Sequence, residues 1–344
     1  MSVGEGPDAM RIAVTGSIAS DHLMTFPGSF TEHLIEGHLD RVSLSFLADE
    51  LEIRRGGVAA NIGFGLGLLG LSPVLVGAVG ADFTADHEVW LRQHGVDTSG
   101  VRVSTERHTA RFVCTTDRDQ NQIATFYAGA MAEARHIRLT EVMQRTGSFG
   151  VTIIGANDPD AMVAHTSECR DAGYQFLADP SQQLARADGD TVRTLVEGAA
   201  GLFTNEYERQ LIQQKTGWPA EDILARVGFW VTTLGAKGAA VDRKGGETVT
   251  VPAVPPRQAA DPTGAGDAFR AGFLAGLAWE LGDERSSQLG CLLATLALES
   301  VGPQEYQLDR ADWLGRFAAA YGDTAAADIE PRLPVSAGQP AVTG

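Results

Sequence analysis

One nine-residue stretch combines glycines and aspartates in an order that suits phosphate chemistry. It reads Asp261-Pro262-Thr263-Gly264-Ala265-Gly266-Asp267-Ala268-Phe269 and leads into an apolar run, residues 268–277, that predicts a buried helix. The first turn of a helix presents N–H groups at the positive end of its dipole, so Gly264, Ala265 and Gly266 would bind an anion. Asp267 would then suit a base that takes a proton from a hydroxyl attacking a bound phosphate. Capping of the helix by an acidic residue is the alternative.

A second group of polar residues lies in the first 61 residues. Ser17 and Asp21 follow a short apolar strand, residues 11–16, and Asp21 could accept a hydrogen bond from a substrate hydroxyl or act as a turn or cap residue. Gly56 and Gly57 open an apolar helix that carries Asn61 in its first turn. Paired glycines let a backbone approach a ligand closely, although a simple turn with a helix cap explains them too.

Two further patterns suit a nucleotide with its metal. Asn205 and Glu208 are three residues apart at a predicted helix start, so they share one face and could hold Mg²⁺ through water. Helix capping by the same pair is the alternative. Residues 233–238, Thr-Leu-Gly-Ala-Lys-Gly, predict a glycine-rich hairpin turn that could pass over a phosphate. The order of residues in a Walker A loop is absent from the sequence.

The elements that must position these residues fall into two kinds. From residue 151 predicted strands (151–155, 174–178, 201–204, 229–233) alternate with helices, which indicates a mostly parallel central sheet. Segments 101–103, 109–116 and 122–127 instead alternate apolar and polar residues, as antiparallel strands covered on one face do. With a strand pair at 39–53 they should form a lid. Phe112 and Phe126 of this lid could stack on a flat ring or be plain core aromatics.

We therefore expect an α/β protein with a large domain and a small β lid. The large domain takes residues 10–38, 54–99 and 128–330, the lid takes 39–53 and 100–127, and residues 1–9 and 333–344 form loose termini. Residues 65–70 match the dinucleotide fingerprint G-x-G-x-x-G, but they lie inside a predicted helix. We interpret these glycines as close helix packing and not as a cofactor site.

Composition limits the classes of partner. The chain has 344 residues, 44% of them hydrophobic, and a net charge of -17, which argues against nucleic acid or an anionic membrane as the main partner. Cys114, Cys169 and Cys291 are far apart, which indicates reduced thiols and no zinc site. Without a basic N-terminal region or a long apolar segment, the sequence predicts a cytoplasmic protein that binds small molecules.

In combination, Gly56-Gly57 with Asn61, Asn205 with Glu208, and the 261–267 stretch resemble the ribokinase-like (PfkB) carbohydrate and nucleoside kinases over about residues 10 to 325. Pro262 departs from the threonine usual at the second position of the family's last motif. Segments 14–23, 43–46, 178–186 and 304–306 look like those of the adenosine kinases of actinobacteria. Residues 179–183 read Asp-Pro-Ser-Gln-Gln where sugar kinases of the family carry Asp-x-Asn-x-Arg, which weakens a sugar-kinase interpretation.

The resemblance implies a three-layer ribokinase-like fold and transfer of the γ-phosphate of ATP to the 5′-hydroxyl of adenosine. It implies Asp267 as base, with Gly264, Ala265 and Gly266 as the anion hole. Mg²⁺ with ATP is implied, and K⁺ near Asp261 and the 300–304 loop. The residues implied to bind the nucleoside are Ser17, Asp21, Ser45, Gly57, Asn61, Phe112, Phe126, Gln182, Gln183 and Arg186. Those implied to serve ATP and Mg²⁺ are Asn205, Glu208, Thr233, Leu234, Gly235, Ala236, Lys237, Gly238 and Gly266.

Two alternatives stay open. A ribokinase-like sugar kinase or another nucleoside kinase would share most of these residues, and a non-catalytic ligand-binding relative would need a disrupted Asp267 or anion hole, neither of which the sequence has. Exposed lid strands pair readily, so a homodimer through the lids is a further hypothesis.

Overall fold

A computed structural model describes residues 10–33 and 45–335. Its largest sheet has eight strands in the order β14-β13-β12-β11-β10-β9-β1-β4. The strands from β12 to β4 run parallel, and β13 and β14 close one edge in antiparallel pairing. Their bounds are β1 Ile12–Thr15, β4 Val74–Val76, β9 Val151–Ile154, β10 Phe176–Ala178, β11 Gly201–Asn205, β12 Trp230–Thr233, β13 Ala239–Asp242 and β14 Val249–Val251.

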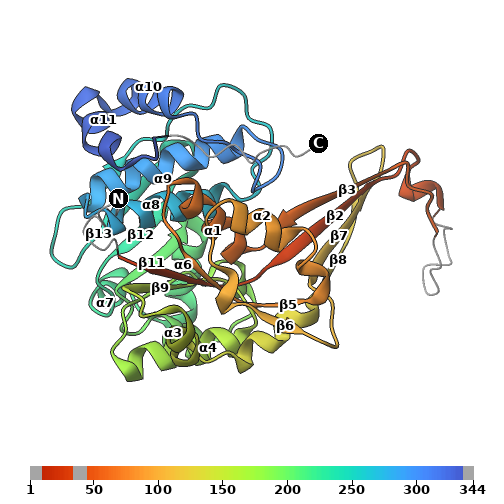
Figure 1. The fold of residues 1–344 in the computed structure, drawn as a ribbon, viewed down its shortest axis with the longest axis horizontal. Helices are drawn as coiled ribbons and strands as arrows, with labels where there is room; N and C mark the ends of the chain where they lie inside the picture. The colour runs from red at the N-terminus through yellow and green to blue at the C-terminus, as the bar shows by residue number, and fades with distance from the viewer. Residues whose placement is uncertain (1–9, 34–44, 336–344) are drawn as a thin grey trace, which may run out of the picture.

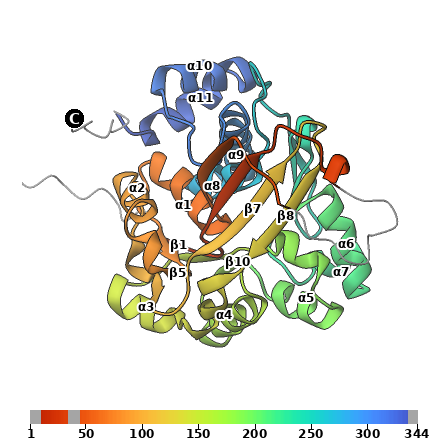
Figure 2. The same cartoon turned by 90° about the vertical axis from the view of Figure 1, so that its right-hand side faces the viewer.

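Helices cover both faces of this sheet, which gives three layers (Figures 1 and 2). Neighbouring residues of one strand enter different cores, since Ile153 packs in one apolar cluster and Ile154 in the other. One face carries α1 Val58–Leu68, α8 Ala265–Ala278, α9 Gly282–Leu298, α10 Arg310–Tyr321 and α11 Asp323–Ile329. The other carries α3 Leu139–Thr146, α4 Pro159–Ala172, α5 Gly189–Val196, α6 Glu206–Thr216 and α7 Ala220–Leu224. Continuous apolar strands fit this double burial.

A four-stranded sheet projects from the body and forms the lid (Figure 1). Its order is β3-β2-β7-β8, with bounds β2 Ala19–Thr25, β3 Glu50–Gly56, β7 Ala110–Thr116 and β8 Gln122–Tyr127. The expected architecture, an α/β domain with a mostly parallel sheet and a small β lid, is confirmed.

The expected composition of the lid was partly wrong. Residues 19–25 form a lid strand and not a part of the large domain, and β2 pairs with β7 in parallel, so the sheet is mixed. The partner of β3 is β2, because seven residues of each strand pair in register. The strand pair expected at 39–53 is therefore wrong over 45–53, where one strand begins at Glu50; residues 39–44 lie outside the described residues.

A third, two-stranded sheet was not expected. The apolar residues 74–80 divide into β4 and β5 Ala78–Gly80, and β5 pairs with β6 Arg102–Ser104, so residues 101–103 do not belong to the lid. The division falls at Gly77, where a side chain would lie 2.8 Å from the carbonyl oxygen of Gly16. The sheet bends away at this crowded point.

Several shorter elements complete the chain. They are α2 His87–Gln93 and the 3₁₀ turns Phe30–His33, Ala81–Phe83, Thr98–Gly100, Gly129–His136, Ser181–Ala185, Gly235–Lys237 and Glu330–Arg332. At the end of the described chain, Leu333 is buried in the core, so the loose C-terminal segment does not begin at residue 333 as expected. Residues 1–9 and 336–344 lie outside the described residues.

Two glycines of the apparent dinucleotide fingerprint, Gly65 and Gly67, serve helix packing as predicted, whereas Gly70 follows α1 in a turn with a φ of 80°. A side chain at Gly65 would come within 2.6 Å of Cβ of Ala271 on α8. At Gly67 it would lie 1.9 Å from the carbonyl oxygen of His94. Both approaches are shorter than any real contact, so α1 can pack here only with glycine.

Candidate active site

The start of α8 brings Asp267 to the carboxyl ends of the parallel strands, where open sheets of this kind bind ligands. Gly264 is the residue before the helix and has a φ of 77°, a conformation that glycine adopts without strain. Asp267 lies in the first helical turn and is half-buried. The helix therefore begins where the sequence predicted it, with backbone N–H groups and one carboxylate at the same end.

The carboxylate of Asp267 is paired with an amide from another helix. Nδ2 of Asn61 on α1 donates to Oδ2 of Asp267 over 2.8 Å. Burial raises the pKa of Asp267 to about 6, the hydrogen bond from Asn61 and the charge of Arg270 lower it, and the charge of Asp179 raises it. A pKa near neutral is what a general base requires. The structure thus brings Asn61, which we expected to hold the ribose, directly against Asp267.

Sequence reasoning missed a buried ion pair below this site. Arg270 of α8 donates from Nη2 to Oδ1 of Asp179 over 2.7 Å and from Nε to the other carboxylate oxygen, and the two side chains are 6% and 0% exposed. Burial acts to lower the pKa of Arg270, but Asp179, Asp267 and Glu208 outweigh it and raise that pKa. One signal was available: a lone arginine within an apolar helix requires a buried partner.

The lid places three expected residues and one missed arginine in a single row. Cα pairing across β3, β2, β7 and β8 aligns Arg54, Asp21, Phe112 and Phe126. Directly paired residues project from the same face of a sheet, so the two aromatic rings share a face with Asp21. Burial raises the pKa of Asp21, while the charge of Arg54 lowers it. Arg54, at one end of this row, contacts the 261–267 stretch, because its Nη1 donates to Oδ2 of Asp261 over 3.1 Å.

The surroundings of Asp261 do not fit a K⁺ ion at its side chain. Its Oδ1 accepts from the backbone N–H of Thr263 over 2.9 Å, and its Oδ2 accepts from the N–H of Gly302 over 3.2 Å and from Arg54. Burial acts to raise the pKa of Asp261, and these donors lower it below its usual value. K⁺ needs oxygen ligands, whereas here N–H donors and a guanidinium surround the carboxylate.

Ser17 and Gly57 lie together where β1 gives way to the lid. Oγ of Ser17 accepts from the backbone N–H of Val58 over 3.0 Å and so caps α1. Gly57 has a φ of 97°, and a side chain there would lie 2.6 Å from the carbonyl oxygen of Ser17. Both residues are thus engaged in joining lid to body, and their roles toward ribose stay predictions.

The structure disperses the other expected nucleoside residues. Gln183 donates from Nε2 to the carbonyl oxygen of Asn157 over 2.8 Å, whereas Gln182 and Arg186 are exposed. Ser45 is exposed beside Phe46, whose ring lies 4.8 Å from that of Phe30 in the 3₁₀ turn that follows β2. The described chain therefore does not bring Ser45 to the start of α8.

On the expected ATP side, Asn205 and Glu208 cap α6. Oδ1 of Asn205 accepts from the N–H of Glu208, and Oε2 of Glu208 accepts from the N–H of Asn205, each over 2.8 Å. Asn205 pairs with Thr233, and residues 233–238 form the predicted hairpin turn between β12 and β13. Burial raises the pKa of Glu208, which the charge of Arg270 lowers. The remaining carboxylate oxygen fits a water-mediated contact with Mg²⁺ brought by ATP, since Mg²⁺ keeps much of its hydration.

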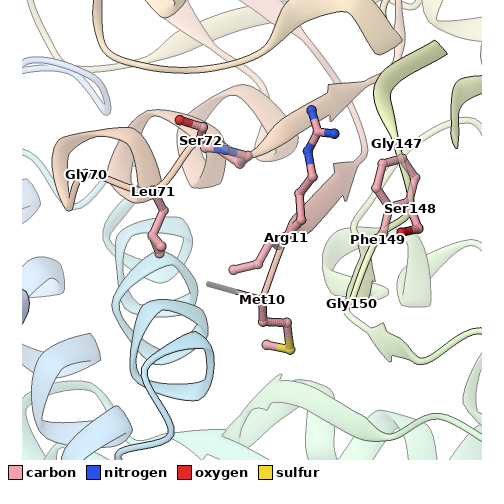
Figure 3. A pocket seen from close by; sticks show the side chains of 11 residues that line it. Met10, Arg11, Gly70, Leu71, Ser72, Gly147, Ser148, Phe149 and Gly150 are labelled. Carbon is pink, nitrogen blue, oxygen red and sulfur yellow. The ribbon is translucent and has the colours of Figure 1, made fainter. Parts of the chain in front are cut away.

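A cavity of about 700 Å³ lies at the wrong end of the sheet for this chemistry (Figure 3). It is lined by Met10, Arg11 and Ile12 at the start of β1, by residues 70–73 before β4 and by residues 147–150 before β9. These are the amino ends of parallel strands. Within residues 10–33 and 45–335 no cluster of three or more His, Cys, Asp or Glu could hold a metal ion, and no helix has the length and apolar character to cross a membrane.

Comparison with known proteins identifies similar folds and sequences. A family model described as pfkB family carbohydrate kinase matches residues 19–310. The nucleoside kinase of Burkholderia thailandensis in complex with inosine superposes with a TM-score of 0.78 at 36% identity, covering 90% of this chain and 98% of that one. Its structure in complex with ADP-inosine gives 0.76 at 36% identity, with 90% and 96% covered. The nucleoside kinase of Methanocaldococcus jannaschii is 29% identical over 253 residues, 72% of this chain and 80% of the relative.

Proposed function

The chain belongs to the pfkB family of carbohydrate kinases, and on this premise we propose that it transfers the γ-phosphate of ATP to the 5′-hydroxyl of adenosine. The observation that carries the proposal is the half-buried Asp267 in the first turn of α8, held by Asn61 and with a pKa of about 6. An aspartate at an anion-binding helix start is poorly explained by phosphate binding alone, because like charges repel. A base for an attacking hydroxyl accounts for it.

The proposed reaction moves the γ-phosphoryl group from ATP to the 5′ oxygen of the nucleoside. Asp267 accepts the proton of the 5′-hydroxyl, the 5′ oxygen forms a bond to the γ-phosphorus, and the bond from that phosphorus to the bridging oxygen of ADP breaks. Gly264 and Gly266 would present backbone N–H groups that stabilise the charge on the transferred phosphoryl group. The N–H of Ala265 donates to the carbonyl oxygen of Pro262 over 3.3 Å, so Ala265 would have to break this contact to join them. Mg²⁺ bound to ATP supplies further charge neutralisation, with Glu208 as the residue that would hold it through water.

The lid supplies the acceptor side of the proposal. Asp21 would accept from a ribose hydroxyl, and Phe112 and Phe126, opposite each other on β7 and β8, would contact the base. A closed lid excludes water, which would otherwise compete with the hydroxyl as acceptor. The relatives support a nucleoside as acceptor, since one of them was solved in complex with inosine. The choice of adenine rests on the resemblance of segments such as 178–186.

The test is the initial rate of ADP formation with Mg-ATP and a panel of adenosine, inosine, guanosine, cytidine and ribose. We expect the highest kcat/KM with adenosine. A higher kcat/KM with inosine or cytidine would support a nucleoside kinase with a preferred nucleobase other than adenine. Ribose well above every nucleoside would select the sugar-kinase alternative, and no turnover with any acceptor would select a non-catalytic relative.

A further inference from the structure

The loop that follows α9 contacts three separate parts of the proposed site through three consecutive residues. The N–H of Gly302 donates to Oδ2 of Asp261 over 3.2 Å. Pro303 lies against Gly264, where an added side chain would come within 2.3 Å of its Cβ. Nε2 of Gln304 donates to Oδ1 of Asn61 over 2.9 Å. This loop therefore packs against the start of α8 and against the amide that contacts Asp267.

Gln304 has no exposed surface, so its side-chain amide must find its partners inside the protein. Its nitrogen is satisfied by Asn61, and its Oε1 has no hydrogen-bond partner among the described residues. Nε2 of His87 on α2 is also buried without a partner there, and Gln304 acts on this ring to raise the pKa of His87. Burial and the charge of Arg55 outweigh Gln304 and Asp86 and lower that pKa to about 4, so His87 is neutral near pH 7 with one N–H to offer.

The hydrogen bonds from Gln304 to Asn61 and from Asn61 to Asp267 fix which end of each amide is the donor. An ionised Asp267 can only accept, so Asn61 must turn Nδ2 toward it and Oδ1 away. Oδ1 then needs a donor, and among the described residues the nitrogen end of the Gln304 amide supplies it. The oxygen end of Gln304 is thereby left without a hydrogen-bond partner among the described residues, as is Nε2 of His87. Reversing Gln304 would place two oxygens against each other beside a buried amide, a costly arrangement.

We propose that Gln304 is a positioning residue that fixes the Asn61 amide so that it donates to the carboxylate of Asp267. Gln304 is fully buried, and its one hydrogen bond among the described residues goes to Asn61, so it would act on Asp267 through Asn61. Three other groups act electrostatically with Asp267, namely Arg270 on the same helix, Asp179 after β10 and Tyr306 on the loop itself. The hydrogen bond from Asn61 is the one that Gln304 controls. The inference rests on the proposed function for its kinetic consequence but not for its effect on the Asp267 proton.

The test replaces Gln304 by Met, which keeps the length of the side chain and removes both ends of the amide. With Asn61 free to rotate, the carboxylate of Asp267 loses the hydrogen bond that stabilises its ionised form, and its pKa rises. The acidic limb of the pH profile of kcat/KM should therefore move up by about one pH unit. The plateau rate should fall about tenfold, and the KM for the nucleoside should change little. Gln304→Glu keeps the polar character, and at neutral pH its acceptor-only carboxylate should draw Nδ2 of Asn61 away, with an equal or larger loss.

Two controls separate positioning from general damage. Thr216→Val removes a buried hydrogen bond, from Oγ1 of Thr216 to the carbonyl oxygen of Ile212 over 2.7 Å, on α6, and should leave the pH limb unchanged. In an Asn61→Ala background, Gln304→Met should produce no further shift, because its route to Asp267 is already cut. An unchanged limb in both Gln304 variants, or additive shifts in the double variant, would overturn the proposal.

A measurement that needs no turnover keeps this inference separate from the proposed function. Carbon-13 NMR titration of aspartate carboxyls, with the Asp267→Asn spectrum as the assignment, gives the pKa of Asp267 directly. A pKa raised by about one unit in Gln304→Met supports the positioning role even if the wild type phosphorylates no acceptor tested, which would refute only the kinase. Active wild type with an unmoved Asp267 pKa in the variant refutes the positioning role and leaves the kinase intact.

Discussion

At the scale of single residues, Asp267 is the group on which activity should depend most. Asp267→Asn keeps the size of the side chain and an oxygen that can accept from Asn61, but it cannot take a proton. We expect kcat to fall by about 10²–10⁴-fold while the dissociation constant for adenosine changes less than about threefold. Steady-state kinetics and calorimetric titration check the two halves. Near-normal turnover in this variant would refute the assignment of Asp267 as base.

The same residue should make the protein less stable as the pH rises. The pKa of Asp267 is raised from 3.8 to about 6, so the folded chain binds more protons than the unfolded chain between these values. The free energy of unfolding therefore falls as pH increases through that window, by at most about 3 kcal/mol.

Asp267→Asn removes this dependence, which can be measured against the wild type. The variant should have the higher Tm at pH 8, and the difference should shrink toward zero near pH 4. Thermal unfolding at both pH values checks the prediction. A variant less stable than the wild type at pH 8 would show that the folded protein stabilises the ionised form of Asp267, which contradicts a pKa raised by burial.

At the scale of elements, α1 offers a matched pair of glycines. Gly65→Ala would force a methyl group against Ala271 and the hydroxyl of Tyr306, at 2.6 and 2.7 Å, and should lower the free energy of unfolding by about 1–3 kcal/mol. Gly63→Ala meets only Val96, at 3.6 Å, and should be neutral or stabilising by up to about 1 kcal/mol because alanine favours the helix. Chemical denaturation of both variants decides this, and equal free energies of unfolding would contradict the packing argument.

Elements with strong apolar patterns could be predicted from the sequence, and elements formed by pairing could not. Residues 159–172 and 310–321 carry helical patterns and form α4 and α10 within those bounds. The strand β2 reads Ala-Ser-Asp-His-Leu-Met-Thr, and its polar residues hid it. It is a strand because β3 and β7 supply backbone partners on both sides. Such pairing is tertiary information that a local pattern does not contain.

The site shows the same division. The position of Asp267 in the first turn of α8 follows from local sequence, namely two glycines before an apolar run. The contact between Asn61 and Asp267 joins residues 206 positions apart, and the contact between Gln304 and Asn61 joins residues 243 positions apart. Neither spacing carries a signal, because the distance in sequence between two packed helices is set by the intervening fold. Asn205 and Glu208 were placed correctly, and the capping alternative is the one observed.

At the scale of the whole molecule, the lid exposes one apolar face. Leu51, Ile53 and Ile123 are 57%, 62% and 45% exposed, and pairing places them opposite to the face with Phe112. We predict that two lids cover these faces in a homodimer. Light scattering should give a dimer at micromolar protein, and Ile53→Lys should give a monomer of nearly unchanged Tm. A wild type that remains a monomer would remove the prediction.

Two of the connections between lid and body are short, which bears on whether a lid can be exchanged between related proteins. Only Gly16, Ser17 and Ile18 separate β1 from β2, and only Gly57 separates β3 from α1. The two connections pack against each other, since the backbone of residues 17–19 fills the space where Gly57 would carry a side chain. A lid exchanged between relatives would thus carry the proposed ribose contact of Asp21 with it. In chimeras, the acceptor contacts proposed for Asp21, Phe112 and Phe126 should move with the lid, whereas Asn61, segment 178–186 and the nucleotide choice should stay with the body.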